Sequence, residues 1–293
     1  MPTRDSSLPA ERNHGTYLRE LCRELCLECP PERVRALEDF VGLFLQWNRR
    51  MNLSAIHDPA AVWTQHVADC LAVVPLVTGL KALRHARLPA HSGAWGAPPP
   101  FTVLDAGTGA GLPAVVLSLW LPDSPVLAVD KVAKKLAFVR QVAAKLRLLR
   151  LQTCHARLED LRLPGMGDKL GEAPAPMQTQ PPALIRPPAC ATTPTATPTT
   201  TPTTTPTLPA EGADVVISRA FASLLHFVGC TAHLIHPRGF WLAMKGRYPD
   251  AEISALTKAQ PAVRVKVDPV SVPGLGQERC VVQMWRETRA GTG

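Results

Sequence analysis

The sequence predicts an α/β fold in which a mostly parallel sheet of seven strands is covered by helices on both faces. From residue 101 onward, short apolar runs alternate with longer helical patterns, which is typical of parallel sheets. Two β-rich runs close the chain and predict an antiparallel C-terminal hairpin. Residues 1–80 carry only helical patterns, so they are predicted to form an N-terminal helical element.

The N-terminal element is predicted from leucine spacing and from prolines. Helices are expected at 17–29, 31–47 and 58–77. Pro30-Pro31 separates the first two helices, because the second proline suits the start of a helix. Residues 48–56 are predicted to be a loop. Residues 81–100, with two glycines and three consecutive prolines, are predicted to be a linker.

The sheet domain is predicted to occupy 101–290. Its candidate strands are 101–105, 126–130, 150–154, 213–218, 239–245, 263–268 and 280–285. Its candidate helices are 112–121, 132–149, 222–234 and 250–259. A Thr/Pro-rich stretch at about 165–210 offers no apolar face, and we expect it to be a disordered insertion.

Composition limits the classes of partner. A formal net charge of +8 and a pI near 9.3 favour nucleic acid as a partner. No uninterrupted apolar stretch is long enough for a membrane span, and the N-terminus lacks the apolar core of a signal peptide. The eight cysteines are scattered, which fits reduced thiols. We therefore expect a cytoplasmic protein, a monomer that does not contact membranes.

The chain is organised around a glycine-rich turn between the first predicted strand and the next helix. Asp105 precedes three alternating glycines, Gly107, Gly109 and Gly111, and Leu112 follows them. Glycines let the backbone approach a ligand closely. The dinucleotide fingerprint is spaced differently, and an acid at this point suits an ammonium group better than a pyrophosphate. The turn therefore favours S-adenosylmethionine over NAD.

Further polar residues lie at or just after the ends of other predicted strands, where ligands of parallel sheets bind. Asp130 could accept hydrogen bonds from the ribose hydroxyls of adenosine, or it could cap the next helix. Leu158 and Glu159 fall where an adenine ring would lie, or they belong to a surface loop. Arg219 and Lys245 are possible contacts to the substrate or the transition state.

The helix predicted at 132–149 carries five basic residues and no acidic one. Lys134, Arg140 and Lys145 are candidate contacts to nucleic-acid phosphates, although a solvated helix face is equally compatible with the pattern. The helix would bury a stripe that includes Leu136 and Val139.

The segment Ile217–Leu224 lacks the groups that several methyl-transfer chemistries need. It contains neither an Asn/Asp-Pro-Pro-Tyr sequence nor a cysteine nucleophile. An acceptor with a free lone pair and no proton to lose needs neither, and N7 of guanine is such an atom. Arg219 would contact cofactor or substrate, or it forms a salt bridge that holds the loop.

Metal binding is not expected. Cys22, Cys26 and Cys29 lie on a predicted helix without a second Cys/His pair at ligand spacing. His66 and Asp69 are three residues apart on another helix, where a helix-stabilising or interdomain hydrogen bond is favoured over a metal or acid–base pair.

Several blocks together resemble one family, the bacterial RsmG proteins, also called glucose-inhibited division protein B. They are Phe44-Leu-Gln-Trp-Asn-Arg-Arg-Met-Asn-Leu-Ser54, His66-Val-Ala-Asp-Cys-Leu71, Asp105-Ala-Gly-Thr-Gly-Ala-Gly-Leu-Pro113, Phe138-Val-Arg-Gln-Val142, Ser218-Arg-Ala-Phe-Ala-Ser-Leu224 and Met244-Lys-Gly246. The resemblance covers about 31–84, 101–164 and 211–286.

The resemblance implies a class I, Rossmann-like, S-adenosylmethionine-dependent methyltransferase that modifies N7 of a guanine in 16S ribosomal RNA. Its substrate would be that RNA or the small ribosomal subunit. The cofactor contacts that it implies, matched to positions here, are Gly107, Leu112, Leu158, Glu159 and Arg219, with Asp130 as the acid after the second strand. A methyltransferase of a protein or small molecule and a non-catalytic ribosome assembly factor stay open as alternatives.

Overall fold

A computed structural model describes residues 14–88, 99–164, 208–219, 221, 223–273 and 275–287. The predicted disordered insertion lies almost entirely outside the described residues, as does half of the predicted linker, 89–98. The described residues belong to one compact unit that includes both the N-terminal helices and the sheet.

The N-terminal element is helical, as predicted. Its helices are α1 (His14–Glu24), α2 (Pro31–Met51), α3 (Pro59–Val62), the π-helical turn η1 (Trp63–Ala68), α4 (Asp69–Leu71) and α5 (Val74–Ala86). Asp58 is the N-cap of α3, and its carboxylate accepts a hydrogen bond from the amide of Ala61 at 2.7 Å.

Three predicted boundaries in this element were wrong. Helix α1 ends at Glu24 because Cys26 adopts a left-handed φ of +54°, so the three cysteines do not share one helix. Helix α2 continues to Met51 and is followed by its C-cap Asn52, which is left-handed at φ +48°. Helix α5 runs to Ala86, six residues into the predicted linker, because no glycine or proline interrupts 81–86.

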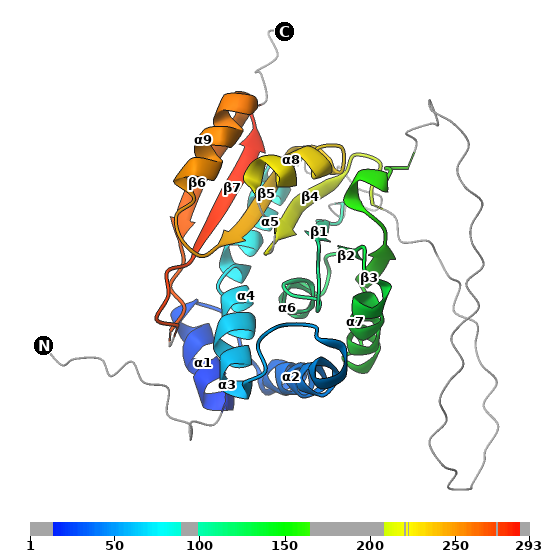
Figure 1. Ribbon diagram of the computed structural model, residues 1–293, viewed down its shortest axis with the longest axis vertical. Coiled ribbons are helices and arrows are strands. Elements are labelled where there is room, and N and C mark those ends of the chain that lie inside the picture. The colour runs from blue at the N-terminus through cyan, green and yellow to red at the C-terminus, as the bar shows by residue number, and fades with distance from the viewer. Residues whose placement is uncertain are drawn as a thin grey trace, which may run out of the picture. The chain divides into compact units, whose positions relative to one another are not determined.

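The seven-stranded sheet is confirmed (Figure 1). Its strands are β1 (Val103–Ala106), β2 (Val126–Asp130), β3 (Leu151–His155), β4 (Ala213–Ser218), β5 (Ile235–Lys245), β6 (Val263–Pro269) and β7 (Cys280–Arg286). Their order is β3-β2-β1-β4-β5-β7-β6. The first five strands are parallel, and β7 is antiparallel to both β5 and β6. The C-terminal hairpin therefore pairs with β5 through β7, and β6 forms the edge of a mostly parallel sheet.

Helices cover both faces of the sheet. They are α6 (Ala114–Trp120), α7 (Ala133–Lys145), α8 (Leu224–Thr231) and α9 (Asp250–Ala259), and the short 3-10 turn η3 (Leu158–Asp160) follows β3. Helix α7 ends four residues earlier than predicted, and Arg147 just beyond it has a left-handed φ of +53°.

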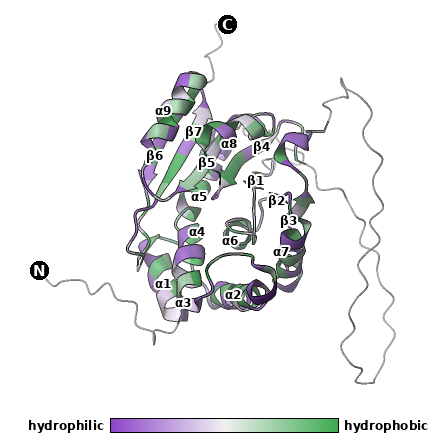
Figure 2. Cartoon of the chain, in the orientation of Figure 1, coloured by the Kyte–Doolittle hydropathy of each residue, from purple (hydrophilic) through white to green (hydrophobic). Residues whose placement is uncertain are grey.

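The core has two parts, because successive strand residues point to opposite faces. Val103, Val126 and Val215 pack with α6, α7 and the N-terminal helices, whereas Leu104, Leu127 and Val216 pack with α8 and α9. Figure 2 shows both hydrophobic and hydrophilic residues along α2, whose buried side includes Phe40 and Phe44. The rings of both lie 6.2 Å from the ring of Phe138 on α7. The N-terminal element therefore shares its core with the sheet domain.

The helical run Pro59–Ala86 is long and apolar enough to cross a membrane by length and composition alone. Its residues Val62, Val67, Leu71, Val74 and Val77 are fully buried in the protein core. Packing against the rest of the chain explains why these apolar side chains are needed, so the run is a core element of this fold.

Candidate functional site

The glycine-rich turn joins β1 to α6 and adopts a backbone that favours glycine. Gly107, Gly109 and Gly111 have φ values of +70°, +57° and +78°, which L side chains rarely adopt. At Gly111 an added Cβ would also lie 3.0 Å from Val115 and 3.1 Å from Val139. The turn thus needs glycine both for its backbone conformation and for its close packing on α7.

Asp105 stabilises the turn through hydrogen bonds on the side away from the neighbouring cavity. Its Oδ2 accepts hydrogen bonds from the Thr108 hydroxyl at 2.6 Å and from the Ala114 amide at 3.0 Å. The side chain is buried, and burial raises the pKa of its carboxyl to about 6. Oδ1 has no hydrogen-bond partner among the described residues. Asp105 is not among the residues that line the neighbouring cavity, so its direct contact is with the turn.

Asp130, at the end of β2, supports the same turn from the side. Its Oδ2 accepts a hydrogen bond from the Gly109 amide at 2.9 Å, and its Oδ1 accepts one from the Val132 amide at 2.8 Å. The N-cap of α7 is Val132, and no side chain caps this helix, so the alternative role of Asp130 as the helix cap was wrong. Asp130 also lines the cavity, which is compatible with the predicted contact to a ribose.

A cavity of about 550 Å³ opens at the carboxyl ends of β1, β2, β3 and β4. Four of the predicted cofactor residues line it: Gly107, Asp130, Leu158 and Glu159. Gly109, Gly111 and Leu112 shape the turn but are not among its lining residues. The sequence interpretation missed several other lining residues, namely Lys131, Lys135, Ser218, Phe221 and His226.

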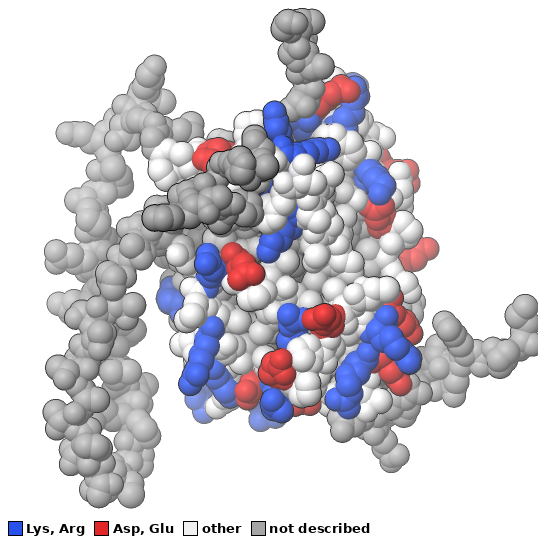
Figure 3. All heavy atoms as spheres, turned by 180° about the vertical axis from the view of Figure 1, so that it is seen from behind, with Lys and Arg blue, Asp and Glu red and all other residues white. Residues whose placement is uncertain are grey.

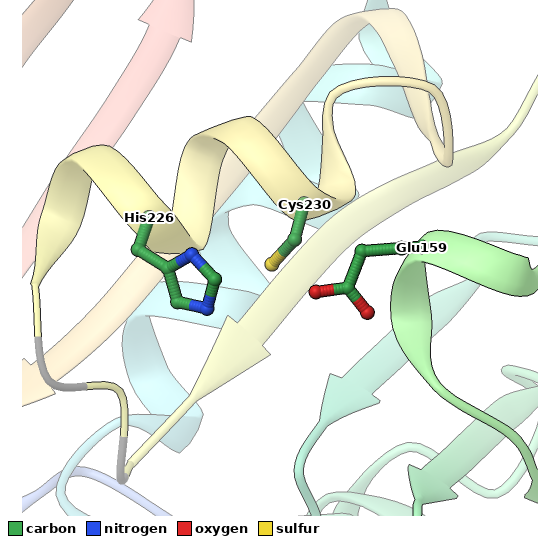
Figure 4. Close-up of side chains that lie close together, drawn as sticks. All are labelled: Glu159, His226 and Cys230. Carbon is green, nitrogen blue, oxygen red and sulfur yellow. The ribbon is translucent and has the colours of Figure 1, made fainter.

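Three side chains with metal-binding chemistry meet in the part of the chain that the structure describes. Glu159 from η3 faces His226 and Cys230, which are four residues apart on α8 (Figure 4). Their ligand atoms lie within 4.8 Å of one another. The Cys230 thiol donates to the Phe227 carbonyl oxygen at 3.5 Å, and burial raises its pKa to about 11. This arrangement keeps the thiol protonated at neutral pH.

Arg219, just after β4, reaches the N-terminal element instead of the first cavity. Its Nη1 lies 3.0 Å from Nδ1 of His66 and 3.4 Å from the Gln65 carbonyl oxygen. A guanidinium only donates, so this contact needs Nδ1 as the acceptor, whereas the Gln65 carbonyl oxygen, 3.1 Å from the same Nδ1, only accepts. We take the shorter contact, that with Arg219, to set Nδ1 as the acceptor and Nε2 as the ring nitrogen that carries the proton. Nε2 lies 2.9 Å from the hydroxyl oxygen of Ser54. Arg219, His66 and Ser54 are therefore linked by consecutive hydrogen bonds. His66 thus makes the expected hydrogen bond between the N-terminal element and the sheet domain.

His66 is held neutral. Burial, followed by the positive charge of Arg219, lowers the pKa of its imidazole to about 4. Protonation would place a second positive charge against the guanidinium and would remove the acceptor that Arg219 uses.

The Trp-Asn-x-x-x-Asn-Leu motif holds the loop that presents Ser54. Asn48 accepts a hydrogen bond from the Ser54 amide at 2.8 Å and donates to the Ile56 carbonyl oxygen at 2.9 Å. Asn52 supplies the left-handed residue that ends α2, and Leu53 is buried. These residues were matched to a family by sequence, but the role of Ser54 emerges only from the structure.

Lys245, at the end of β5, braces the loop after β4. Its ammonium donates to the Phe221 carbonyl oxygen at 3.0 Å and to Glu252 at 2.8 Å. Glu252 in turn accepts a hydrogen bond from the Leu224 amide at 2.9 Å. Lys245, through Glu252, therefore stabilises the loop that leads into α8.

A second cavity of about 290 Å³ lies beside this support. Arg219 and Lys245 line it together with His66 and Asp69 from the N-terminal element. The Asp69 carboxylate pairs with Arg279, with 3.3 Å between Oδ1 and Nε. Ser218 lines the first cavity and Arg219 the second, so consecutive residues contribute to the two cavities.

The three candidate phosphate-binding residues of α7 are exposed. Lys145 pairs with Asp39 of α2 at 3.0 Å, and Arg140 donates to the Thr153 hydroxyl at 3.3 Å. On the face behind that of Figure 1, Lys and Arg are interspersed with Asp and Glu (Figure 3). The net positive charge of the chain is therefore not concentrated on that face.

Comparison with known proteins gives consistent matches over most of the chain. A family model described as rRNA small subunit methyltransferase G matches residues 33–169 and 205–282. A protein named ribosomal RNA small subunit methyltransferase G from Acidovorax sp. (strain JS42) is 34% identical over 265 residues, or 90% of this chain and 92% of the relative. One with the same name from Bordetella avium (strain 197N) is 33% identical over 282 residues, or 96% and 97%.

Proposed function

The chain belongs to the family of rRNA small subunit methyltransferase G, and we propose that it transfers a methyl group from S-adenosylmethionine to N7 of a guanine in 16S ribosomal RNA. The observation that carries the proposal is the cavity beside the glycine-rich turn, where Gly107, Asp130 and Leu158 line one volume. Its place at the carboxyl ends of parallel strands is where such sheets bind ligands.

The residues around this cavity suit S-adenosylmethionine. Each oxygen of Asp130 accepts one backbone hydrogen bond, which leaves a lone pair on each for a ribose hydroxyl. Gly107 allows the ligand close to the backbone, and Leu158 offers an apolar wall for the base. Asp105, behind the turn, holds the geometry without touching the cavity.

The reaction requires no general base. Bound S-adenosylmethionine supplies an electrophilic methyl group on its sulfonium. The N7 lone pair forms the new N–C bond while the S–C bond breaks, so the guanine gains the positive charge and no proton leaves. The neutral His66, whose Nδ1 accepts from Arg219, fits a positioning role. Catalysis would rest on orientation of the two reactants in a water-poor site.

The assigned contacts follow from this geometry. We assign Gly107, Asp130, Leu158 and Glu159 to the cofactor. Arg219 lines the second cavity, one residue after Ser218 of the first, and Lys245 positions the loop after β4. We keep Lys134, Arg140 and Lys145 as the proposed phosphate-binding residues. All three are exposed, although Arg140 and Lys145 also make contacts within the protein. We also propose that the protein acts in the cytoplasm as a monomer, without a metal ion or a membrane.

The function is tested by supplying labelled S-adenosylmethionine with 30S particles, naked 16S rRNA or a protein extract. Label in RNA from either of the first two substrates, mapped to 7-methylguanosine, is the expected result. Label only in protein or in small molecules would favour another methyltransferase class. Cofactor binding without transfer to any substrate would favour a non-catalytic assembly factor.

A further inference from the structure

The second cavity has the place and the chemistry of an acceptor site. It begins at Arg219, one residue after Ser218 of the cofactor cavity, and its volume of about 290 Å³ is near the lower limit for small-ligand pockets. Asp69 and Gln65 from the N-terminal element, Met244 near the end of β5 and Arg279 before β7 contribute to its wall. Three of the blocks that resemble the family, His66–Leu71, Ser218–Leu224 and Met244–Gly246, therefore contribute residues to this cavity.

The polar groups in the cavity differ in what they can offer to a base. Nη1 of Arg219 already donates to His66, and Nε of Arg279 lies against Asp69. The Asp69 carboxylate accepts only, and its two oxygens have about four lone-pair sites, of which Arg279 takes one. Asp69 is thus an acceptor in a buried wall.

We infer that this cavity holds the acceptor guanine and that Asp69 accepts hydrogen bonds from its N1–H and 2-amino group. This inference rests on the proposed function and names the residue that selects the base. Adenine has an acceptor at N1 and no 2-amino group, so it would face the carboxylate with a repulsive pairing.

The assignment also fits the atom that reacts. Arginine reads guanine most often through O6 and N7, which would occupy the lone pair needed for methyl transfer. N7 lies on the opposite edge of the purine from N1 and the 2-amino group. A carboxylate on the latter edge therefore leaves N7 without a protein contact.

The test compares Asp69→Asn with Arg279→Met in single-turnover methyl transfer. Arg279→Met removes the same ion pair but keeps the carboxylate, so it is the matched control. The RNA substrate carries either guanosine or inosine at the methylated position, since inosine lacks only the 2-amino group. For the wild-type protein we expect inosine to slow transfer roughly 10-fold or more, in the range of one lost base contact.

In Asp69→Asn, transfer to guanosine should fall roughly 10- to 100-fold, and inosine should cause little further loss, because an amide has one acceptor oxygen and one donor NH2 and so cannot accept from N1–H and the 2-amino group together. Arg279→Met should keep the preference for guanosine over inosine. Calorimetric affinity for S-adenosylmethionine should stay near that of the wild type in both variants.

A full inosine penalty in Asp69→Asn would overturn the inference, as would equal losses in both variants. If Asp69→Asn fails to fold, the rates of the wild-type protein on guanosine and inosine RNA are compared instead. Equal rates on the two RNAs would overturn the assignment. Absence of transfer from wild-type protein to any RNA would instead contradict the proposed function itself, so the two failures are distinguishable.

Discussion

The Asp130 carboxylate both supports the glycine-rich turn and lines the first cavity, the proposed cofactor site. Asp130→Asn keeps the shape of the side chain but removes its charge and replaces one acceptor with an amide group. We expect its affinity for S-adenosylmethionine to fall roughly 10- to 100-fold, the usual cost of losing a hydrogen bond to a charged group. Isothermal titration calorimetry measures this directly.

The matched control is Asp123→Asn, which changes an exposed aspartate in the turn between α6 and β2. It should bind the cofactor as the wild type does. Unchanged affinity in Asp130→Asn would remove Asp130 from the site.

His66 gives the stability of the fold a defined pH dependence. Its pKa is about 4 in the folded protein against 6.5 in the unfolded chain. Between these values only the unfolded chain binds the proton, so stability is lost as the pH falls from 6.5 toward 4, by at most about 1.4 kcal/mol per pH unit.

Urea unfolding of wild-type protein and His66→Gln at pH 7, 6 and 5 measures this effect. The difference in unfolding free energy between the two proteins should shrink as the pH falls. His226→Gln changes an exposed histidine and should track the wild type. A difference that stays constant with pH would mean that His66 does not titrate in this way.

Local and long-range contacts differ in how well the sequence reveals them. The positions of Gly107 and Asp130 were predictable, because the turn, the strand end and the spacing between them are local patterns. The hydrogen bond between Arg219 and His66 joins residues 153 positions apart, and no periodicity encodes it. The buried position of Asp105 was also not evident from its place before the turn.

At the scale of elements, Lys245 on β5 and Glu252 on α9 hold the loop between β4 and α8. The ion pair is largely buried, with 14% and 27% of the two side chains exposed. Lys245→Met and Glu252→Gln should each lower the unfolding free energy by about 1–2 kcal/mol. Because the residues share one interaction, the double variant should lose less than the sum of the two.

Chemical denaturation of the two single variants and the double variant forms a complete cycle. We also expect slower methyl transfer in both single variants, because the Phe221 carbonyl and the Leu224 amide lose their partners. Additive losses of stability would show that the two side chains act independently.

Elements were predictable in kind and order but less so at their ends. Strands β4 and β1 lie within one or two residues of their predicted positions, since their apolar runs are bounded by polar residues. The ends of α1, α2 and α7 depend on single non-glycine residues in left-handed conformations, Cys26, Asn52 and Arg147. Such residues carry weaker signals than glycine or proline, so these ends were misplaced.

At the scale of the whole molecule, the Thr/Pro-rich stretch is predicted to be dispensable for folding. The family model leaves a gap between its two matched ranges, 33–169 and 205–282. Leu163 and Leu208, on either side of the stretch, belong to the same core cluster. We expect replacement of 170–205 by a short Gly/Ser linker to preserve the fold and the affinity for S-adenosylmethionine.

Circular dichroism, thermal unfolding and calorimetry compare this deletion with the full chain. Loss of cooperative unfolding in the deleted protein would show that the stretch contributes to the folded core. Retained folding with weakened transfer to 30S particles would instead assign the stretch to substrate contact.

We propose that this chain methylates a guanine of 16S ribosomal RNA at N7. Mass mapping of nuclease digests from 16S rRNA, after reaction with wild-type protein or Asp130→Asn, tests it most directly. We predict one oligonucleotide that gains a single methyl group, identified as 7-methylguanosine, in the wild-type reaction and strongly reduced in the variant. A digest without methylated guanine, or a methyl group on another atom or base, would contradict the claim.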